Sequence, residues 1–298
     1  MFLFRFIGKL IRFIIKTIFI VVMVAIILTV SGYVLVRETL DFDPYDTIKY
    51  SCSLADPVDV TTLSPNAFTS EDMAGAYSGV NSVVPNMITY SQENGYVVTF
   101  ENLSKMNGLM ALSDKQLGAL AQQIISQEGR NTLTLGGRSL AFEIVQIDVL
   151  NLNADNSSLT DKASVNFVIK VDITSIKSSL SLFPLKYLGE ALPDYVYVSS
   201  TVLLEVDETG FSYTLSHQSL TVNNFDDFKT EDFFRSLDVL MKTGTVEDFG
   251  IEIADAILGA LVGNEQQNGV VYSLKNSGAK GFAFAEINDV QYLLIVKN

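Results

Sequence analysis

His217 is the only histidine in the chain and therefore its only imidazole. It belongs to an alternating apolar–polar run at 211–222, which places it on one strand face with Phe211 and Tyr213. A Ser-His-acid hydrolase needs a serine and an acid that the fold brings to the imidazole. Ser216 is the neighbour of His217 in sequence, and the chain has no GxSxG motif that would identify another serine as the nucleophile. We expect a histidine on a strand face, and a hydrolase that uses His217 stays open as one hypothesis.

Two pairs of carboxylates could do acid–base chemistry on a glycoside, Asp226 with Asp227 and Glu231 with Asp232. Both pairs lie where a helix is expected to begin, and acidic side chains in a first turn interact favourably with the helix dipole. Trp, a ring on which sugars stack, is absent from the chain. Helix capping therefore explains the two pairs, and we expect no enzymatic activity.

Asp41, Asp43 and Asp46 could bind calcium, but the segment lacks the Gly turn and the distal Glu of an EF-hand loop. Cys52 is the only cysteine, so the chain has no intrachain disulfide and no cysteine-based zinc site. It has no Walker A motif and no GxGxxG motif. We expect a solvated acidic loop, a free thiol, and no metal or cofactor.

Charge is distributed unevenly along the chain. Residues 1–36 contain four basic residues and no acidic one, which leaves −18 on the remainder of a chain with a net charge of −14. An acidic domain repels the phosphates of nucleic acids, so we expect no DNA or RNA partner. Hydrophobic residues make up 48% of the sequence, which excludes intrinsic disorder as the dominant state.

Residues 17–36 contain no charged side chain, and this helical length of about 30 Å matches the hydrocarbon core of a membrane. We expect a transmembrane helix that the mature protein retains. The alternative is a cleaved signal peptide with Val30-Ser31-Gly32 as the cleavage site, although the uncharged run continues beyond it.

Four basic residues precede this run at spacings of four, three and four, which places them on one stripe of a helix. We expect residues 1–16 to form a cytoplasmic basic amphipathic helix whose cations reach the lipid headgroups. The positive-inside rule then places the N-terminus in the cytoplasm and residues 38–298 outside, as an extracytoplasmic domain. The proposed membrane-anchoring residues are Arg5, Lys9, Arg12 and Lys16.

The chain after the span divides into a stalk at 37–70 and a domain at 71–298. The stalk is rich in Asp, Ser, Thr and Pro, so we expect it to have little regular structure. In the domain, residues 83–90 and 96–100 flank Asn94-Gly95, a strong hairpin signal.

Ser113 predicts the start of an amphipathic helix, because Gln116 three residues later completes a capping box. Gly129 marks the C-terminal end of this helix. Its apolar stripe consists of Leu117, Leu120, Ala121, Ile124 and Ile125.

Long strands follow this helix. Residues 162–174 alternate between apolar and polar side chains, with Val168 as the one exception. Residues 142–152, 195–206 and 211–222 are predicted as further strands. Such strands exceed the usual length of about 5–6 residues and predict an extended, strongly curved antiparallel sheet. The fold class is therefore α+β, a sheet-dominated domain packed on amphipathic helices.

The segments around these strands are expected to be helices and turns. Helices are predicted to begin at Thr230 and Thr245, where acidic residues occupy the first turn. A short helix over 185–193 ends at Pro193. Residues 270–297 are predicted as a three-strand meander with Asn288-Asp289 as its last turn.

The inward apolar face of these elements is the candidate ligand site. It encloses either a groove for a lipid or another hydrophobic ligand, or a core that its own side chains fill. The candidate groove residues are Leu117, Leu120, Ile124, Val165, Phe167, Ile169, Val171, Val196, Val198, Val202, Leu204, Phe234 and Leu237.

The helix that begins at Leu112-Ser-Asp-Lys-Gln-Leu117 and the long strands after it resemble small single-span envelope proteins of the YpmS type from Gram-positive bacteria. Leu192-Pro193-Asp194-Tyr195 before a strand adds to the likeness, which covers residues 110–262. The chain also resembles the tubular lipid-binding (TULIP) superfamily. The resemblance implies a long curved sheet wrapped around a helix, a hydrophobic channel for acyl chains, and no catalytic residue.

We therefore expect a single-pass cell-membrane protein whose extracytoplasmic domain binds a lipid or lipid-linked envelope precursor in an apolar groove, as a carrier. The alternative is a non-enzymatic structural or interaction module that docks an envelope protein complex. The first hypothesis predicts an apolar face that its own side chains cannot fill. The second predicts a filled core with an exposed apolar patch.

Overall fold

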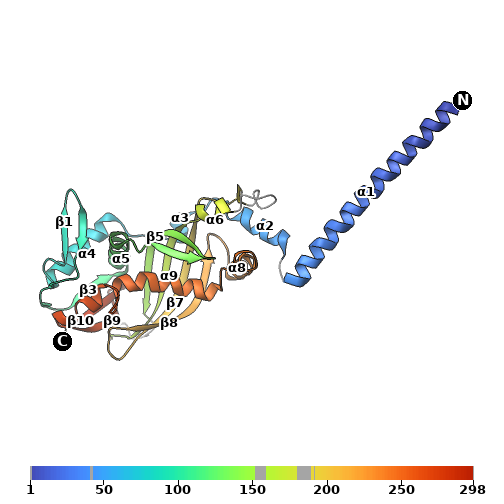
Figure 1. Cartoon of the computed structure of the whole chain (residues 1–298). Helices are drawn as coiled ribbons and strands as arrows, with labels where there is room; N and C mark the ends of the chain where they lie inside the picture. Colours follow the sequence, from blue (N-terminus) through green and yellow to red (C-terminus); the bar gives the residue numbers. More distant parts are fainter. Residues whose placement is uncertain (1, 41–42, 152–158, 180–188, 191, 298) are drawn as a thin grey trace. The chain divides into compact units, whose positions relative to one another are not determined.

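The computed structural model shows the expected mixed α+β chain, with a long N-terminal helix and a curled antiparallel sheet (Figure 1). The chain divides into two compact units, residues 1–49 and 50–298. The structure describes residues 2–40, 43–151, 159–179, 189–190 and 192–297.

The first unit consists largely of α1 (Phe2–Leu40), a continuous helix that contains both the basic segment and the uncharged run. Within it, Phe19–Thr39 is long and apolar enough to cross a membrane, by length and composition, and this stretch is not buried inside the protein. The helix required for the span expected at 17–36 is therefore present. The basic residues in the first half of α1 are Arg5, Lys9, Arg12 and Lys16.

Residues 37–70, expected to have little regular structure, contain the helices α2 (Pro44–Ser53) and α3 (Val60–Leu63). The expectation was wrong because aspartates that read as loop signals are helix caps. Asp43 and Asp59 accept hydrogen bonds from backbone N–H groups in the first turns of these helices, at 2.9 Å and 3.1 Å.

The second unit is built on a five-stranded antiparallel sheet in the order β4-β5-β6-β7-β8. Its four long strands occupy the segments that alternation predicts, and the sheet curls into a half-barrel (Figure 1). Register shifts between Ile144 and Gln146 and between Thr201 and Val202 mark bulges that bend the strands. The strands are β4 (Thr132–Leu135), β5 (Arg138–Asn151), β6 (Lys162–Asp172), β7 (Tyr195–Val206) and β8 (Tyr213–Val222).

Val168 interrupts the alternation of β6 because the outer face of the sheet is covered at this point. It pairs with Gln146 on β5, and both side chains are buried. The backbone N–H of Asn66 donates to Gln146 Oε1 at 2.9 Å, so the chain that follows α3 crosses this face. The exception in the pattern thus reflects a contact with a segment far away in sequence.

Two helices pack on the concave side, α5 (Asp114–Glu128) and α9 (Val246–Leu261) (Figure 1). Both begin with capping boxes, of which the sequence analysis predicted the one at Ser113. Hydrogen bonds tie α9 to both edges of the sheet. Glu252 accepts from a backbone N–H of β4 at 2.7 Å, and Asp255 accepts from the Tyr213 hydroxyl of β8 at 2.9 Å. The helix therefore bridges the open side of the half-barrel.

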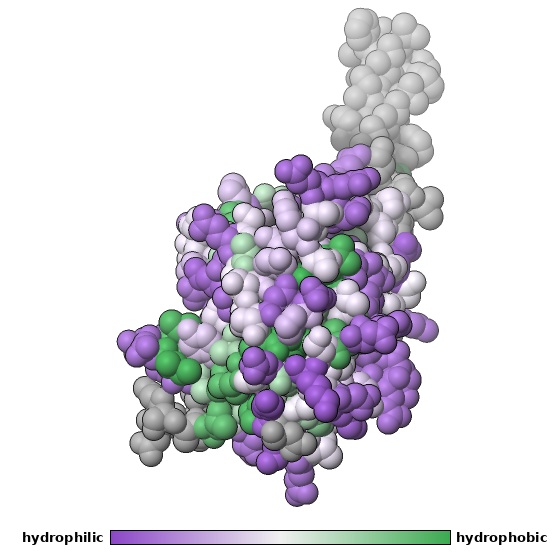
Figure 2. Space-filling view, turned by 90° about the vertical axis from the view of Figure 1, so that its left-hand side faces the viewer, coloured by the Kyte–Doolittle hydropathy of each residue, from purple (hydrophilic) through white to green (hydrophobic). Residues whose placement is uncertain are grey.

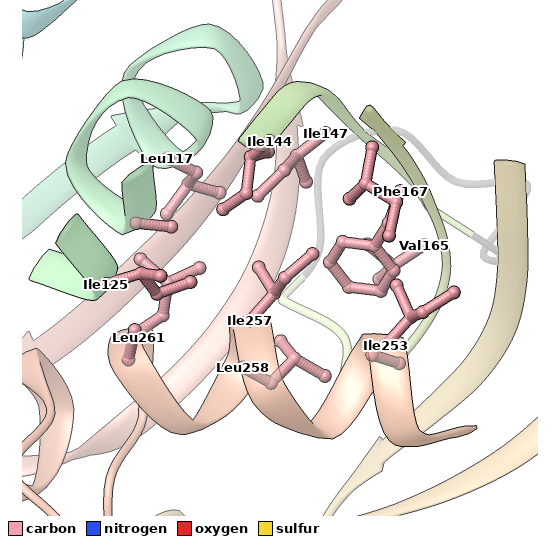
Figure 3. Close-up of a cluster of buried hydrophobic side chains, with 14 of the residues drawn as sticks. Leu117, Ile125, Ile144, Ile147, Val165, Phe167, Ile253, Ile257, Leu258 and Leu261 are labelled. Carbon is pink, nitrogen blue, oxygen red and sulfur yellow. The ribbon is translucent and has the colours of Figure 1, made fainter. Parts of the chain in front are cut away.

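Side chains from the sheet and the two helices fill the space between them (Figure 3). Fully burying one large apolar side chain contributes about 1.5–3 kcal/mol, so this cluster is a main source of stability. The residues shown around α9 are Leu117, Ile125, Ile144, Ile147, Val165, Phe167, Ile253, Ile257, Leu258 and Leu261.

Two further helices flank the strand ends, the short α6 (Thr174–Ser179) and α8 (Asp227–Met241). α8 begins three residues before the predicted Thr230, because Asp226 is the N-cap and accepts from the backbone N–H of Lys229 at 2.9 Å. The short helix expected over 185–193 lies largely outside the described residues.

The hairpin expected around Asn94-Gly95 is present, with β1 (Ile88–Ser91) paired to β2 (Gly95–Val98). Its first strand is shorter than predicted, because Val83 ends the capped helix α4 (Ser70–Val83) and residues 84–87 form a turn in which Asn86 has a φ of 68°.

The prediction of a three-strand meander at 270–297 was wrong for the first strand. That part forms α10 (Val270–Ser273) and the short 3-10 helix η1 (Lys275–Ser277). A short apolar run does not distinguish a buried strand from a buried helix, which is why the pattern misled.

The rest of the C-terminal region forms the expected hairpin of β9 (Ala279–Ile287) and β10 (Val290–Lys297). Asn288 and Asp289 make its turn with φ of 54° and 62°. The third strand of this sheet is β3 (Met110–Ser113), which pairs with β10 and comes from before α5.

Candidate functional site

An apolar cavity lies at one end of the curled sheet, between the strand ends and α8. Its volume is about 60 Å³, and fourteen of the fifteen described residues that line it are apolar. The remaining lining residue is Ser51. The apolar ones are Leu54, Leu135, Leu140, Val171, Ile173, Ile176, Leu192, Val196, Val198, Val222, Phe233, Phe234, Leu237 and Phe249.

Neighbouring valines on three strands form one wall of the cavity. Val196 and Val198 are two residues apart on β7 and therefore project to the same side. Val196 pairs with Val171 of β6, and Val198 pairs with Val222 of β8. Pairing thus gathers β-branched side chains into a continuous apolar surface.

The structure brings only part of the predicted groove to this cavity. The predicted residues that line it are Val171, Val196, Val198, Phe234 and Leu237. The other predicted residues are buried in the core, where the helices fill the half-barrel. These are Leu117, Leu120, Ile124, Val165, Phe167, Ile169, Val202 and Leu204.

Leu54, just after α2, lines the cavity, although sequence analysis assigned it to the stalk. Asn223 holds it there, since its side-chain Nδ2 donates to the backbone oxygen of Leu54 at 3.0 Å. The same buried side chain accepts from the backbone N–H of Tyr197 at 2.7 Å through Oδ1. A polar residue directly after a buried strand indicates that its side chain needs a hydrogen-bond partner, but the sequence does not show that this partner is the backbone of Leu54.

A row of aromatic rings closes the cavity on the side of α8. Phe225, Phe233, Phe234 and Phe249 follow one another with ring-centroid distances of 6.0, 6.4 and 5.5 Å. The first two contacts are edge-to-face, the arrangement that the charge distribution of aromatic rings favours. Sequence analysis identified only Phe234 of this row as a site residue, because the local pattern does not show which rings the fold brings together.

His217 lies on the inner side of β8, opposite Val202 of β7. Its imidazole packs against Gly250 of α9, where an added Cβ would lie 2.7 Å from Nδ1. Nδ1 is buried and has no hydrogen-bond partner among the described residues. The hydroxyl of Ser200 donates to the backbone oxygen of Gly250 instead, at 3.0 Å. The described side chains therefore do not form a Ser-His-acid triad, which needs partners at both ring nitrogens.

Three of the acidic residues singled out in the sequence have structural partners. Asp226 caps α8, and Asp232 accepts from the Tyr50 hydroxyl at 3.2 Å and pairs with Arg235. Asp43 caps α2, while Asp41 lies outside the described residues. In the part of the chain that the structure describes, no group of three or more His, Cys, Asp or Glu residues could hold a metal ion.

A larger and more polar hollow of about 750 Å³ lies on the outer side of the sheet, at the start of α5. Asp114 borders it, and burial raises the pKa of this carboxyl, with a smaller contribution from the Asp148 charge. Asn166 Oδ1 accepts from the hydroxyls of Ser199 and Thr201 at 2.8 and 3.2 Å. Polar groups around this hollow thus bond to one another.

Comparison of the chain with protein-family models, with curated proteins and with solved structures finds no match.

Proposed function

We propose that this chain is a single-pass membrane protein whose folded domain binds the end of an acyl chain in the apolar cavity. The observation that carries the proposal is the lining, to which the described residues contribute fourteen apolar side chains and one serine. A polar ligand would lose its hydrogen bonds to water there without replacement, whereas apolar burial gains about 25 cal/mol per Å².

The size of the cavity limits the part of the ligand that it can hold. A group the size of a water molecule needs about 10–15 Å³ of cavity volume. The cavity of about 60 Å³ therefore accommodates roughly four to six groups of methylene size. The occupant is thus the end of a hydrocarbon chain, and the rest of the ligand extends beyond the cavity.

The chain length between span and cavity supports a membrane lipid, or a lipid-linked envelope precursor, as the source of this acyl chain. Ser51 lies 12 residues after Thr39, the last residue of the apolar stretch. Even a fully extended chain of that length covers only about 40 Å, so the cavity stays close to a bilayer that α1 crosses. With the N-terminus in the cytoplasm, as the positive-inside rule predicts, the domain would lie beside the outer leaflet.

Photochemical labelling of the full chain in lipid nanodiscs tests this function. The probe is a phospholipid with a diazirine at the terminal carbon of one acyl chain, and adducts are mapped by peptide mass spectrometry. We expect adducts on peptides that contain Val198 and Phe249, in addition to adducts on α1. Labelling of α1 serves as the internal control for incorporation of the probe and for the span.

Val198→Phe fills the cavity and should reduce labelling of the cavity peptides at least tenfold while α1 labelling persists. Leu203→Phe introduces the same ring on the opposite face of β7 and should leave the cavity adducts in place. Circular dichroism establishes that both variants fold. Adducts confined to α1 in the folded unmodified chain would disprove acyl-chain binding.

That negative result would favour the second candidate, an interaction module. Ile287 and Val290 pair across the β9–β10 turn and are 46% and 39% exposed. Val290 and Leu150, which is 53% exposed, border the same outer hollow. Figure 2 shows apolar groups gathered among polar ones on the face that it views. Such a patch is typical of a surface that docks a partner protein.

A further inference from the structure

Strand β8 forms one edge of the five-stranded sheet, because it pairs with β7 on one side only (Figure 1). Its ten residues, Tyr213–Val222, include no Asp, Glu, Lys, Arg or Pro. The unpaired N–H and C=O groups of an edge strand can recruit another strand, so sheets usually protect their edges with charged residues, proline, a short strand or a covering segment. The sequence of β8 lacks the first three of these protections.

Both strands of the β1–β2 hairpin have edges that side chains cover. Asn81 of α4 exchanges two hydrogen bonds with the backbone of Ile88 on β1, at 2.6 and 3.0 Å. Gln127 of α5 does the same for Val98 on β2, at 2.8 and 2.9 Å. The side-chain amides thus take the place of a neighbouring strand.

The edges of the two larger sheets other than β8 are also protected. Glu252 of α9 accepts a hydrogen bond from the backbone N–H of Thr134 on β4 at 2.7 Å. On β9, Phe284 exchanges two backbone hydrogen bonds with Thr160, at 2.9 and 3.0 Å. Strand β3 is only four residues long. The fold therefore covers or shortens these edges.

The first half of β8 has no such cover. The backbone N–H of Asp207 donates to the oxygen of Ser212 at 3.0 Å, so Ser212 faces β7 just before β8 begins. Backbone direction alternates along an antiparallel pair, so Tyr213, Leu215 and His217 direct their N–H and C=O groups away from β7. Among the described residues, none bonds to these backbone groups from the free side of β8.

Side chains along this edge are covered only in part. Leu215 and His217 are half-buried, whereas Leu204 and Val202, which pair with them on β7, are 0% exposed. All four lie on the inner face of the sheet, so the difference reflects the missing neighbour beside β8. A further strand would cover the exposed part of these side chains.

We propose that β8 pairs antiparallel with β8 of a second copy of this chain, so that two five-stranded sheets join into one. The regular part of the edge is 213–217, because the register shift opposite Thr201 and Val202 leaves Gln218 as a bulge. A two-fold axis at the centre of this segment passes beside Leu215. Leu215 then lies opposite Leu215 of the second copy, and the unpaired backbone groups of both edges satisfy one another.

The sequence of 213–217 is complementary to itself in this register. Tyr213 lies opposite His217 of the second copy, and Thr214 lies opposite Ser216. Pairs of aromatic or aliphatic side chains and pairs of hydroxyl side chains stabilise neighbouring strands, whereas like charges opposite one another destabilise them. Although the chain has a net charge of −14, this segment brings no two carboxylates face to face.

Anchoring in a common membrane favours a second copy as the occupant. Five paired residues bury far less than the area of about 1,200–2,000 Å² that is typical of stable protein complexes. Two copies that α1 holds in one bilayer meet at a raised effective concentration, which compensates for a small interface. We therefore expect the dimer in membranes, and its formation does not depend on acyl-chain binding.

Disulfide cross-linking of the full chain tests the pairing and its register. Thr214→Cys and Ser216→Cys are each made in a Cys52→Ser background, and cells produce either variant alone or both together. The two positions lie directly opposite in the proposed dimer, at a Cα separation of about 4.5 Å, which a disulfide can bridge. Identical positions are diagonal neighbours at about 7–8 Å, which exceeds the range of a disulfide.

Isolated membranes are oxidised with copper phenanthroline, and covalent dimer is measured on a non-reducing gel. We expect at least tenfold more dimer when the two variants are produced together than when either is produced alone. The single variants control for random collisions, since both side chains are exposed. Equal cross-linking in all three samples would contradict the register, and no dimer in the mixed sample would overturn the pairing.

A charge at the two-fold axis gives a second test. Leu215→Lys, added to both cysteine variants, places two ammonium groups opposite each other and should reduce the dimer at least tenfold. Ile287→Lys is the matched control, because it introduces the same charge at an apolar position that is 46% exposed and lies on β9. Circular dichroism of the purified variants establishes that they fold. Undiminished cross-linking in folded Leu215→Lys would show that the two chains do not meet along β8.

Discussion

The hydroxyl of Tyr213 joins the outermost strand of the sheet to the helix that crosses it. It donates to Asp255 at 2.9 Å, and burial, with the nearby Asp255 charge, raises the pKa of Tyr213 above its ordinary value of 10.0. A group whose pKa is higher in the folded than in the unfolded state contributes stability below its unfolded pKa. That contribution is complete below about pH 10 and is lost as the pH rises further.

Tyr213→Phe should therefore lower the free energy of unfolding at pH 7 by about 1 kcal/mol, the usual net value of such a hydrogen bond. Above pH 10, the parent protein should lose stability more steeply than the variant. Urea unfolding at several pH values between 7 and 11 measures both effects. Parallel pH profiles for the two proteins would show that this hydroxyl does not titrate with folding.

Val198 and Val202 show what the sequence predicts of the site and what it does not. They lie on the same face of the same strand, and alternation correctly predicts both as buried. Val198 borders the cavity, whereas Val202 packs in the filled core. The difference depends on where α9 begins beside the strand, a contact between distant segments that no local pattern encodes.

Among the elements, the β7–β8 turn is held by a close approach of two glycines. A Cβ added at Gly281 of β9 would lie 2.6 Å from the Cα of Gly210 in this turn. Phe282 also donates its backbone N–H to the oxygen of Gly210 at 3.0 Å. The turn of the large sheet is thus fastened directly to the small sheet.

Gly281→Ala should destabilise the protein by about 2 kcal/mol, because it forces the turn and β9 apart in addition to straining the backbone. Gly278→Ala is the matched control, since its φ of 101° is also positive but no atom lies within 4 Å of the added Cβ. Thermal unfolding of both variants should show a clearly smaller loss for Gly278→Ala. Equal losses would mean that strain alone, and not the contact between turn and strand, limits this position.

Helices and strands that are long enough to show a periodic pattern of apolar residues were predictable from the sequence, and short ones were not. The four long strands and the helix starts at Ser113 and Thr245 follow from alternation and capping, which are local properties of the chain. α2 and α10 were missed because ten and four residues contain too little periodicity to separate a helix from a loop or strand. Their helical form depends on caps and on packing against the rest of the fold.

At the scale of the whole molecule, the proposed topology makes a prediction about the single thiol. Cys52 is exposed and is the only cysteine, so no background substitution is needed. If residues 38–298 are extracytoplasmic, a membrane-impermeant maleimide should label Cys52 in intact cells. If α1 is retained as a membrane anchor, the labelled protein should remain in the membrane fraction.

Lys9→Cys in a Cys52→Ser background supplies the opposite control and should react only after the cells are permeabilised. Labelling of Cys52 only after permeabilisation would reverse the orientation. Labelled protein in the soluble fraction would instead indicate cleavage of the N-terminal segment.

The attachment of Leu54 to the cavity wall has a mechanical consequence. Any tension on the chain from the side of α1 reaches the second unit through α2, and Leu54 is among the first residues there that are buried. A pull at this point acts on the hydrogen bond from Asn223 and on the apolar wall before it acts on the sheet. If the chain is anchored in a membrane and binds an acyl chain as proposed, force between the anchor and the domain would therefore loosen the cavity first and so couple mechanical load to ligand retention.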